Sequence, residues 1–479
     1  MSHVTRVGRE IQRYLAIEPV QIAELDLEPG PGPGPGPGPG PGPGPDGGGV
    51  LRPGPGSPPV THGEVFLLVR RGGRPVAALL GRVPEGADPT AVLTELARQH
   101  PDSGPAPAPA PVATGSAVPF TTVVIATRER ADRLAHALDS MLAQDHPDFE
   151  IVVVDNAPVT DATRDLVGRE YAERVRYVTE PVPGLAVAHN TGLAAARGDV
   201  VAFTDDDVVA DRRWLTELTA PFAADPGLGC ATGLILPARL RTPAQVLLES
   251  HGGFAKGFAP RTYDPAAPPA DEPLFPFTAG RFGSGANMAF RTGVLRAVGG
   301  FDPATGAGTP ARGGDDLYGF VRVLAQGHRL RYTPQALVWH HHRETWRDLE
   351  TQAYGYGAGL TAYLTALLVN RPALLPAFLA RLPRGLAHAR TLTAARSTDA
   401  RGTNASDTEG VPGASGVPGA SGAPGGHDDR GHPWPRRLSR LQRKGMVYGP
   451  VGYLRARRAL RAVPATGTTG VTGTAGRSR

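Results

Sequence analysis

Proline and glycine alternate without interruption from Pro29 to Pro45, and this tract limits where the chain can fold. Proline has no backbone N–H to give to a helix or sheet, and the alternation offers no apolar face to bury. A second tract, residues 104–118, is rich in proline and alanine. A third, residues 396–432, has glycine at every third position from Gly413 to Gly425, over too few repeats for a collagen triple helix. We predict that all three are disordered linkers.

The linkers divide the 479 residues into unequal parts, of which only residues 119–345 are long enough to bury a large apolar core. Residues 60–103 predict a small accessory module, with a β-hairpin (65–69 and 75–80) around Gly72-Gly73 and a helix over 89–99. The expected order is an N-terminal segment (1–28), a linker (29–59), the module (60–103), a linker (104–118), the main domain (119–345), an apolar helical extension (346–395), a disordered stretch (396–432) and a basic tail (433–479).

Features that bear on the compartment all indicate the cytoplasm. The single cysteine, Cys230, excludes an intramolecular disulfide and suits a reducing environment. The first twenty residues lack the apolar stretch of a signal peptide. The most apolar segment, residues 360–379, is interrupted by Asn370, Arg371 and two prolines, so no spanning helix is expected.

The net charge of +5 is concentrated near the end of the chain. Two interpretations stay open for this segment: peripheral contact with an anionic membrane, and a solvated basic tail. No module that reads nucleic acid is visible, so nucleic-acid binding is not expected. The basic residues of this C-terminal segment are Arg436, Arg437, Arg440, Arg443, Lys444, Arg455, Arg457, Arg458 and Arg461, and the aromatic residues among them are Trp434, Tyr448 and Tyr453.

From Phe120 onward, short β-branched runs alternate with stretches of helical periodicity, which predicts successive βα units and a mostly parallel sheet. Strands are expected at 121–127, 150–154, 175–178 and 200–204, with helices over 131–143, through 166–167 and over 186–196. Ligands of parallel sheets gather beyond the carboxyl ends of the strands. We therefore expect Thr127, Asp155 and Asp205 to converge on one crevice.

Two acidic clusters lie about 110 residues apart: Asp205-Asp206-Asp207 after an apolar run, and Asp315-Asp316 before a predicted helix. Adjacent carboxylates repel unless a cation or hydroxyl donors compensate them, so the first cluster suits a divalent metal beside a diphosphate. The second lies at a helix N-terminus, which favours the ionised carboxylate that a general base requires. Together they indicate sugar transfer from a nucleotide-activated donor.

Over residues 119–345 the chain closely resembles the family 2 glycosyltransferases. The resemblance rests on motifs that occur in the family's order: VVIATRERADRL, IVVVDNAP, PGLAVAHNTGL, FTDDD, GSGANMAFR, GGFDP and GGDDLYGFVRVLAQGHRLRYTPQALVWHHH. The arrangement of the smaller N- and C-terminal parts is also similar to actinobacterial members. The resemblance implies the α/β GT-A fold that binds nucleotide-diphosphate sugars, with a mostly parallel sheet and flanking helices.

The same resemblance implies roles for individual residues. Asp316 would be the base that deprotonates the acceptor hydroxyl, and Asp315 would position the acceptor. Asp207 would be the main ligand of a divalent metal, Mn²⁺ or Mg²⁺, with His340 as a second ligand, and alternation along the strand turns His340 and His342 the same way. Contacts with the nucleotide or donor sugar are implied for Thr127, Arg128, Asp155, Asn190, Asp205, Asp206 and Gly285.

The chain departs from the family pattern at two places. His189 precedes Asn190 where members usually carry arginine, so a positive charge at the diphosphate is not assured there. The QxxRW signature of processive synthases is absent after His342, where the chain reads RETWRDLETQAYGYG. The sequence thus predicts an inverting, non-processive transferase that uses a nucleotide-diphosphate sugar, expected to be a UDP-sugar, and a glycan, lipid-linked or small-molecule hydroxyl acceptor.

Two alternative functions stay open. A nucleotidyltransferase would make the activated sugar, but such enzymes carry a glycine-rich loop after the first strand, where this chain has TRERADR. A non-catalytic sugar-nucleotide-binding or scaffold protein would not need both acidic clusters.

Overall fold

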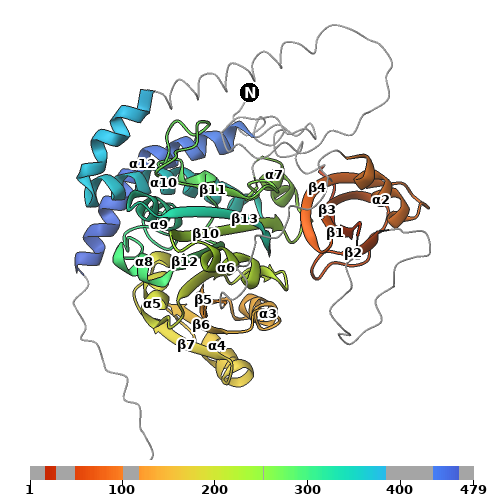
Figure 1. Cartoon of the computed structure of the whole chain (residues 1–479), viewed down its shortest axis with the longest axis horizontal. Coiled ribbons are helices and arrows are strands. Elements are labelled where there is room, and N and C mark those ends of the chain that lie inside the picture. Colours follow the sequence, from red (N-terminus) through yellow and green to blue (C-terminus); the bar gives the residue numbers. More distant parts are fainter. Residues whose placement is uncertain (1–16, 29–48, 101–117, 252, 384–434, 463–479) are drawn as a thin grey trace, which may run out of the picture.

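The computed structural model describes residues 17–28, 49–100, 118–251, 253–383 and 435–462. Its main part is a mixed α/β domain around a nine-stranded sheet in the order β11-β13-β10-β12-β8-β5-β6-β7, with β9 paired to β13 (Figure 1). The predicted α/β fold class is confirmed. The three predicted linkers lie largely outside the described residues.

The half of the sheet that carries the first acidic cluster is parallel, as predicted. Strands β5 (Thr121–Thr127), β6 (Phe149–Asn156), β7 (Val175–Glu180) and β8 (Val200–Asp205) pair side by side in one direction. The apolar residues at the centres of β5, β6 and β8 are buried whichever face they point to. Such β-branched runs, apolar on both faces, are what a sheet covered on both sides requires.

The other half of the sheet is mixed. Strand β12 (Asn287–Arg291) runs antiparallel between β8 and β10 (Leu228–Pro237), while β13 (Arg329–His340) runs parallel to β10. Two short strands, β9 (Val208–Ala210) and β11 (Arg261–Tyr263), pair antiparallel with β13. The short strand predicted at QALVWH is the second half of β13.

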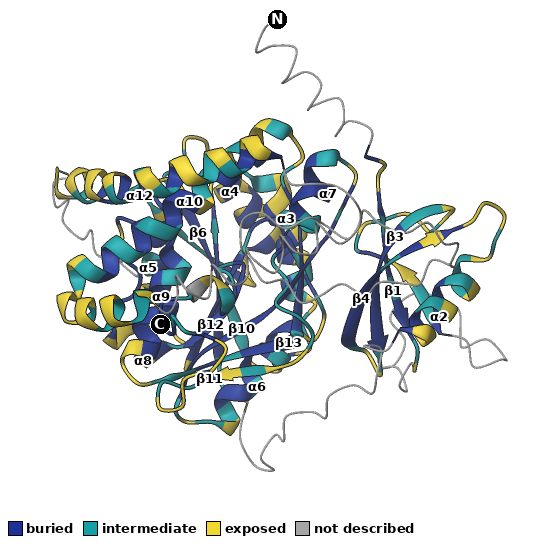
Figure 2. Cartoon of the chain, turned by 90° about the horizontal axis from the view of Figure 1, so that it is seen from above, coloured by how far each residue is buried: buried dark blue, intermediate teal, exposed yellow. Residues whose placement is uncertain are grey.

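Helices cover both faces of the sheet (Figure 2). One face packs against α5 (Leu185–Ala195), α8 (Thr292–Ala297), α9 (Asp315–Ala325), α10 (Trp346–Asn370) and α12 (Arg436–Ala462). The other packs against α3 (Ala131–Leu142), α4 (Ala162–Leu166) with the π-turn η2 (Val167–Tyr171), and α6 (Trp214–Ala224). Shorter elements are α7 (Pro243–Ser250) and the 3₁₀ turns η3 (Ala279–Arg281) and η4 (Pro372–Leu374).

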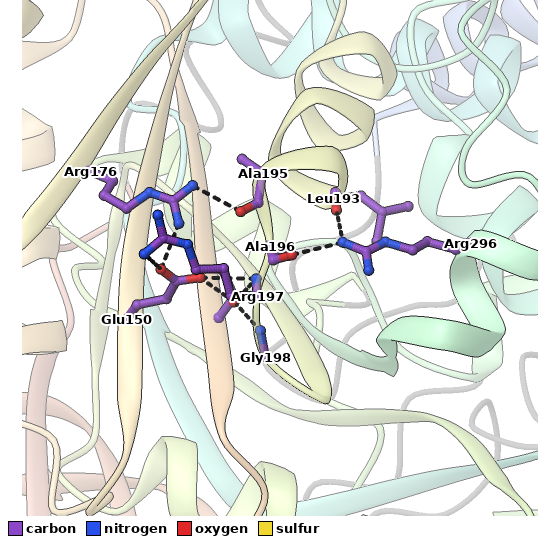
Figure 3. A network of polar contacts seen from close by, with 9 residues as sticks. Glu150, Arg176, Leu193, Ala195, Ala196, Arg197, Gly198 and Arg296 are labelled. Carbon is purple, nitrogen blue, oxygen red and sulfur yellow. Dashed lines mark hydrogen bonds and ion pairs between the residues drawn. The ribbon is translucent and has the colours of Figure 1, made fainter. Parts of the chain in front are cut away.

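The turn from α5 into β8 is fixed by a polar network on the amino side of the strands (Figure 3). Glu150 accepts hydrogen bonds from Arg176 (2.7 Å) and from the backbone N–H of Arg197 (3.0 Å). Arg176 and Arg296 donate to the last carbonyl groups of α5, which have no partner within the helix. The network therefore sets the register at which β8 delivers Asp205 to the opposite edge.

The N-terminal module contains the predicted hairpin, β3 (Gly63–Arg71) and β4 (Arg74–Val83), and the predicted helix, α2 (Pro89–Gln99). Two further strands join it from outside residues 60–103. Strand β1 (Gln21–Asp26) pairs parallel to β3, and β2 (Val50–Pro53) pairs antiparallel to β1, so segments predicted as N-terminal segment and linker belong to this sheet. One face packs on α2 and the other on the main domain.

The basic C-terminal segment forms a long helix, α12, that packs along α10; the prediction of a basic tail needs this correction over residues 436–462. Glycines permit the close approach: a Cβ at Gly445 would lie 2.1 Å from the carbonyl oxygen of Tyr354, and one at Gly449 would lie 2.3 Å from that of Ala358. Tyr453, fully buried on the same face, donates a hydrogen bond to Asp302 (2.9 Å).

Candidate functional site

The carboxyl ends of β5, β6 and β8 meet as predicted. Thr127 pairs in register with Asp155, and the preceding Ala126 pairs with Asp205. Three sequence segments therefore deliver polar side chains to one edge of the sheet. The end of β13 joins them, because β9, directly after the acidic triplet, pairs with it, and the backbone N–H of His341 donates to the carbonyl oxygen of Asp207 (2.9 Å).

The three acids of the triplet have different partners. Asp205, Asp207 and His340 each offer one ligand atom, and these atoms all lie within 4.8 Å of one another. This grouping contains both predicted metal ligands and adds Asp205, which the sequence placed at the donor. Asp206 instead accepts hydrogen bonds from Thr127 (2.7 Å) and Arg130 (3.0 Å) and is buried, so its carboxylate and the Thr127 hydroxyl tie the loop to the end of β5.

Arg130 approaches the acids more closely than Arg133 does, and the sequence interpretation missed it. Its guanidinium lies 3.0 Å from Asp206 and 3.4 Å from Asp207, and Arg133 lies 3.7 Å from Asp207. Arg128, the predicted nucleotide contact, is exposed two residues earlier. The motif TRERADR offered several arginines, and only the direction of the loop after β5 separates them.

We call Asp205, Asp207 and His340 the metal-type group. Burial and neighbouring charges raise the pKa of one of its two acids and lower the pKa of the other. Burial raises the pKa of Asp205 to about 6, and the negative charge of Asp207 adds to the rise. Burial opposes the ionisation of Asp207 too, but its pKa is lowered because His340 and the arginines face it. The pKa of His340 is raised by Asp207 although burial acts against this. Asp207 is thus compensated by the cationic groups around it, whereas Asp205, in the same group, is not.

His340 is held from behind by a polar chain. Its Nδ1 atom lies 3.2 Å from Nδ1 of His342, whose Nε2 lies 2.9 Å from Glu249 on α7. The prediction that the two histidines face the same way is confirmed. Glu249 comes from a helix that no motif connected with the site, and only the spatial arrangement identifies it.

Asp155, at the carboxyl end of β6, has a hydrogen-bond donor for one carboxylate oxygen but not for the other. Tyr177 donates to Oδ2 at 2.7 Å, while Oδ1 is buried and has no hydrogen-bond partner within the described chain. Burial raises the pKa of this carboxyl, and the bond from Tyr177 partly offsets the rise. A buried acceptor without a donor is costly unless a ligand supplies one.

The second acidic cluster places its two members differently. Asp316 accepts hydrogen bonds from the backbone N–H groups of Gly285 (2.9 Å) and Leu317 (2.8 Å). Its pKa is nevertheless raised to about 7, because burial and the neighbouring Asp315 outweigh those bonds. The amides at the helix N-terminus thus favour the ionised carboxylate, as expected, but burial and Asp315 act more strongly on the pKa in the other direction. Gly285, predicted at the donor, contacts Asp316 through its amide.

Asp315 and Asn190 both have partners within the chain. Asp315 is buried, and its Oδ2 lies 3.2 Å from Nδ1 of His189, which is itself buried between Phe203 and Phe301. The carboxamide of Asn190 donates to the carbonyl of Phe301 (2.8 Å) and accepts from its N–H (2.9 Å). His189 and Asn190 thus fasten α5 to the segment that leads to α9.

Residues 122–296 match the family model described as Glycosyl transferase family 2. The chain carries a domain of this family. The recognition made from the motifs is therefore confirmed, and the residues around the acidic triplet, Asp155 and Gly285 all lie inside the family 2 domain.

Relatives agree with this assignment. The chain is 30% identical over 238 residues to the pre-mycofactocin glycosyltransferase of Mycobacterium tuberculosis, covering 49% of this chain and 46% of that protein. It is 26% identical over 234 residues to the glucosyl-dolichyl phosphate glucuronosyltransferase of Haloferax volcanii, covering 46% of this chain and 68% of that protein. The chain thus spans about half the length of the mycobacterial relative that it matches.

Among solved structures, the mannosyltransferase PcManGT from Pyrobaculum calidifontis in complex with GDP-Man and Mn²⁺ is similar at 25% identity and a TM-score of 0.40, covering 60% of this chain and 77% of that chain. No described helix is by itself long and apolar enough to cross a membrane. The helices Trp346–Asn370 and Pro372–Pro383 pass that test only as a pair bent by 109°.

Asp205, Asp207 and His340 have side chains that suit Mn²⁺ or Mg²⁺ as ligands. Asp205 and Asp207 offer the oxygen ligands that both ions prefer, and the imidazole of His340 is acceptable to Mn²⁺. When bound, the ion supplies positive charge that stabilises the negative charge of a departing diphosphate.

Proposed function

We propose that this protein is a metal-dependent, inverting glycosyltransferase that transfers a sugar from a nucleotide-diphosphate donor to a hydroxyl acceptor. The observation that carries the proposal is the presence of two sites in the same α/β domain. One is the group of Asp205, Asp207 and His340 at the sheet edge. The other is Asp316, held by the Gly285 amide with its pKa near neutrality.

In the proposed reaction, Asp316 accepts the proton of the acceptor hydroxyl, and the resulting oxygen attacks the anomeric carbon as the bond to the diphosphate breaks. Direct displacement inverts that carbon. A carboxyl with a pKa of about 7 suits this step, because a base is most effective when its pKa lies close to the operating pH. The amides of Gly285 and Leu317 hold both oxygens of the carboxylate in a fixed direction.

For the donor we propose a UDP-sugar, with Asp155 as the residue that binds the base. Its unpartnered Oδ1 is an acceptor for the ring N–H of a pyrimidine, and the Tyr177 hydroxyl fixes the carboxylate beside it. The acceptor is a glycan, lipid-linked or small-molecule hydroxyl. Transfer is non-processive, which the absence of QxxRW after His342 supports.

We place the protein in the cytoplasm, with peripheral contact at the inner face of the plasma membrane. The single buried cysteine and the basic C-terminal helix support this placement.

A nucleotide-release assay tests the proposal. The full chain is incubated with UDP-, GDP- and dTDP-sugars in the presence of Mn²⁺, Mg²⁺ or EDTA, beside the Asp207→Ala and Asp316→Asn variants. We expect slow hydrolysis of one donor that is lost in EDTA and in Asp207→Ala. If Asp316→Asn stays folded and transfers sugar as well as the parent, the assignment of the base is wrong.

The same assay separates the alternatives. A nucleotidyltransferase would form the sugar nucleotide from a sugar phosphate and a nucleoside triphosphate, with release of pyrophosphate. A non-catalytic binder would give a calorimetric signal with the nucleotide sugar and no turnover in any condition, including after supply of acceptors.

A further inference from the structure

The outer face of α12 carries a continuous row of exposed residues. Residues three or four positions apart lie on the same side of a helix. The exposed positions at that spacing, which we call the outer stripe, are Arg436, Arg440, Arg443, Val447, Val451, Leu454, Arg458 and Arg461. None of these positions belongs to the buried face of α12, the helix that packs along α10 (Figure 2). Basic residues thus occupy both of its ends, and apolar residues occupy its middle.

The apolar middle of the stripe is unusual for a surface in water. Val447 is 81% exposed, and Val451 and Leu454 are 46% and 47% exposed. Single exposed apolar residues need no explanation, but these three lie side by side on one helix face. The packing of α12 does not require them, because its buried face consists of Leu438, Gly445, Gly449, Gly452, Tyr453 and Ala456.

The charged residues of α12 are all positive. The helix has nine basic residues and no acidic residue between Arg436 and Ala462. Within the described part of the chain, Arg440, Arg443 and Arg458 of the outer stripe form no ion pair, whereas Arg437, beside the stripe, pairs with Glu350. A hollow of about 520 Å³ is lined by Arg436, Ser439, Arg440, Gln442, Arg443 and Met446. Three arginines therefore converge on a space that suits an anionic group.

We propose that the outer stripe docks on an anionic phospholipid surface, with α12 lying parallel to the bilayer. In this arrangement Val447, Val451 and Leu454 enter the boundary between headgroups and acyl chains, and the arginines at both ends reach lipid phosphates. Nucleic acid would satisfy the arginines but leave the apolar middle in water. A second copy of the chain would place two strongly positive stripes against each other.

The stripe also connects membrane contact with the acceptor side of the site. A Cβ at Gly452 of α12 would lie 2.6 Å from the carbonyl oxygen of Pro310, five residues before Asp315. A docked α12 would thus hold the loop before Asp315 and Asp316 close to the bilayer. This consequence rests on the proposed function, and it favours a lipid-linked hydroxyl among the three acceptor classes. The docking itself does not depend on transferase activity.

The test is vesicle co-sedimentation of the full chain with phosphatidylcholine alone and with phosphatidylcholine mixed with phosphatidylglycerol. One variant removes the apolar middle (Val447→Ser, Val451→Ser, Leu454→Gln), and a second reverses charge (Arg440→Glu, Arg443→Glu, Arg458→Glu). The charge-reversed variant is compared with a control that reverses two exposed arginines on another element, Arg169→Glu and Arg174→Glu. All changed side chains are exposed, and circular dichroism confirms that each variant is folded.

We expect binding to the anionic vesicles only, weaker by about tenfold or more in either stripe variant, unchanged in the control, and reduced by added salt. Equal binding of the charge-reversed variant, or tighter binding of the parent to a DNA duplex than to anionic vesicles, would overturn the proposal. Nucleotide release is measured on the same samples. Loss of vesicle binding with donor hydrolysis intact separates a failure of docking from a failure of the proposed transferase.

Discussion

The Nδ1 atoms of His340 and His342 lie 3.2 Å apart at the end of β13, so they share one hydrogen. Because Nε2 of His342 faces the Glu249 carboxylate at 2.9 Å, that nitrogen carries a proton and Nδ1 of His342 is the acceptor. His340 then carries a proton on Nδ1 and turns Nε2 toward Asp207, 3.3 Å away. A proton on that Nε2 is favoured by the Asp207 carboxylate, which raises the pKa of His340, and a cation bound between the two side chains would take the place of this proton.

We therefore predict that Glu249→Ala weakens Mn²⁺ binding by about tenfold or more, because His342 loses the acceptor that orients it. Glu249→Gln should lose less, since its carboxamide oxygen still accepts a hydrogen bond. Electron paramagnetic resonance of Mn²⁺ in the presence of UDP measures the affinity without turnover. Glu344→Ala, which removes the same charge at an exposed site, is the control. An equal loss in both variants would contradict the tautomer argument.

Replacing Asp316 should raise stability and lower activity. Its pKa rises from 3.8 to about 7 in the folded chain, so between these values the folded state binds more protons than the unfolded state, and stability falls as pH rises. Asp316→Asn removes this buried charge, and we expect it to stabilise the protein at neutral pH by an amount on the order of 1 kcal/mol. Denaturant titrations at pH 5 and pH 8, as the test conditions, measure the difference.

The same substitution should lower the transfer rate by a factor of about 10² or more, because the general base is lost. In the parent protein the rate should rise as pH increases through about 7, and this rise should vanish in the variant. A flat pH profile in the parent, or the same rise retained in Asp316→Asn, would assign the base elsewhere.

Arg70 joins the N-terminal module to the loop that follows the acidic triplet. It lies 2.6 Å from Glu24 and 2.7 Å from Asp211, and its side chain is 10% exposed. Removing one partner of a buried ion pair leaves the others uncompensated, so Arg70→Met should cost about 3 kcal/mol of unfolding free energy. Arg82→Met, which removes a pairing of a 71% exposed arginine, should cost less than about 1 kcal/mol. If Arg70→Met lost no more unfolding free energy than Arg82→Met, the module would contribute no additional stability through the Arg70 contact.

The sequence was most informative where burial dictates the pattern. Strands β5, β6 and β8 are apolar on both faces and end in polar residues, so their positions and the convergence of Thr127, Asp155 and Asp205 were predictable. Strands β1 and β2 were not, because β2 is a four-residue edge strand that joins β1 across the proline-glycine tract, and such distant pairing leaves no local signal. The orientation of Asn190 and Asp315 depends on backbone contacts with Phe301 and on His189, which no motif contains.

The packing face of α12 escaped detection for a related reason: three of its six buried residues are glycine, which carries no apolar signal. We predict that Gly445→Ala separates α12 from α10, because a Cβ there would lie 2.1 Å from the backbone oxygen of Tyr354. Overpacking of this kind typically costs about 1–3 kcal/mol, and here it should also free the hydroxyl of Tyr453 from Asp302. Hydrogen exchange should then rise along both helices.

Gly168→Ala is the matched control for this prediction, since nothing lies within 4 Å of a Cβ at that position. We expect it to leave unfolding free energy unchanged within about 0.5 kcal/mol, as surface substitutions usually do. Denaturant titration and hydrogen exchange are measured on both variants. If Gly445→Ala exchanges no faster than Gly168→Ala along residues 346–370, α12 does not depend on this contact and the close packing against Tyr354 is not what holds it.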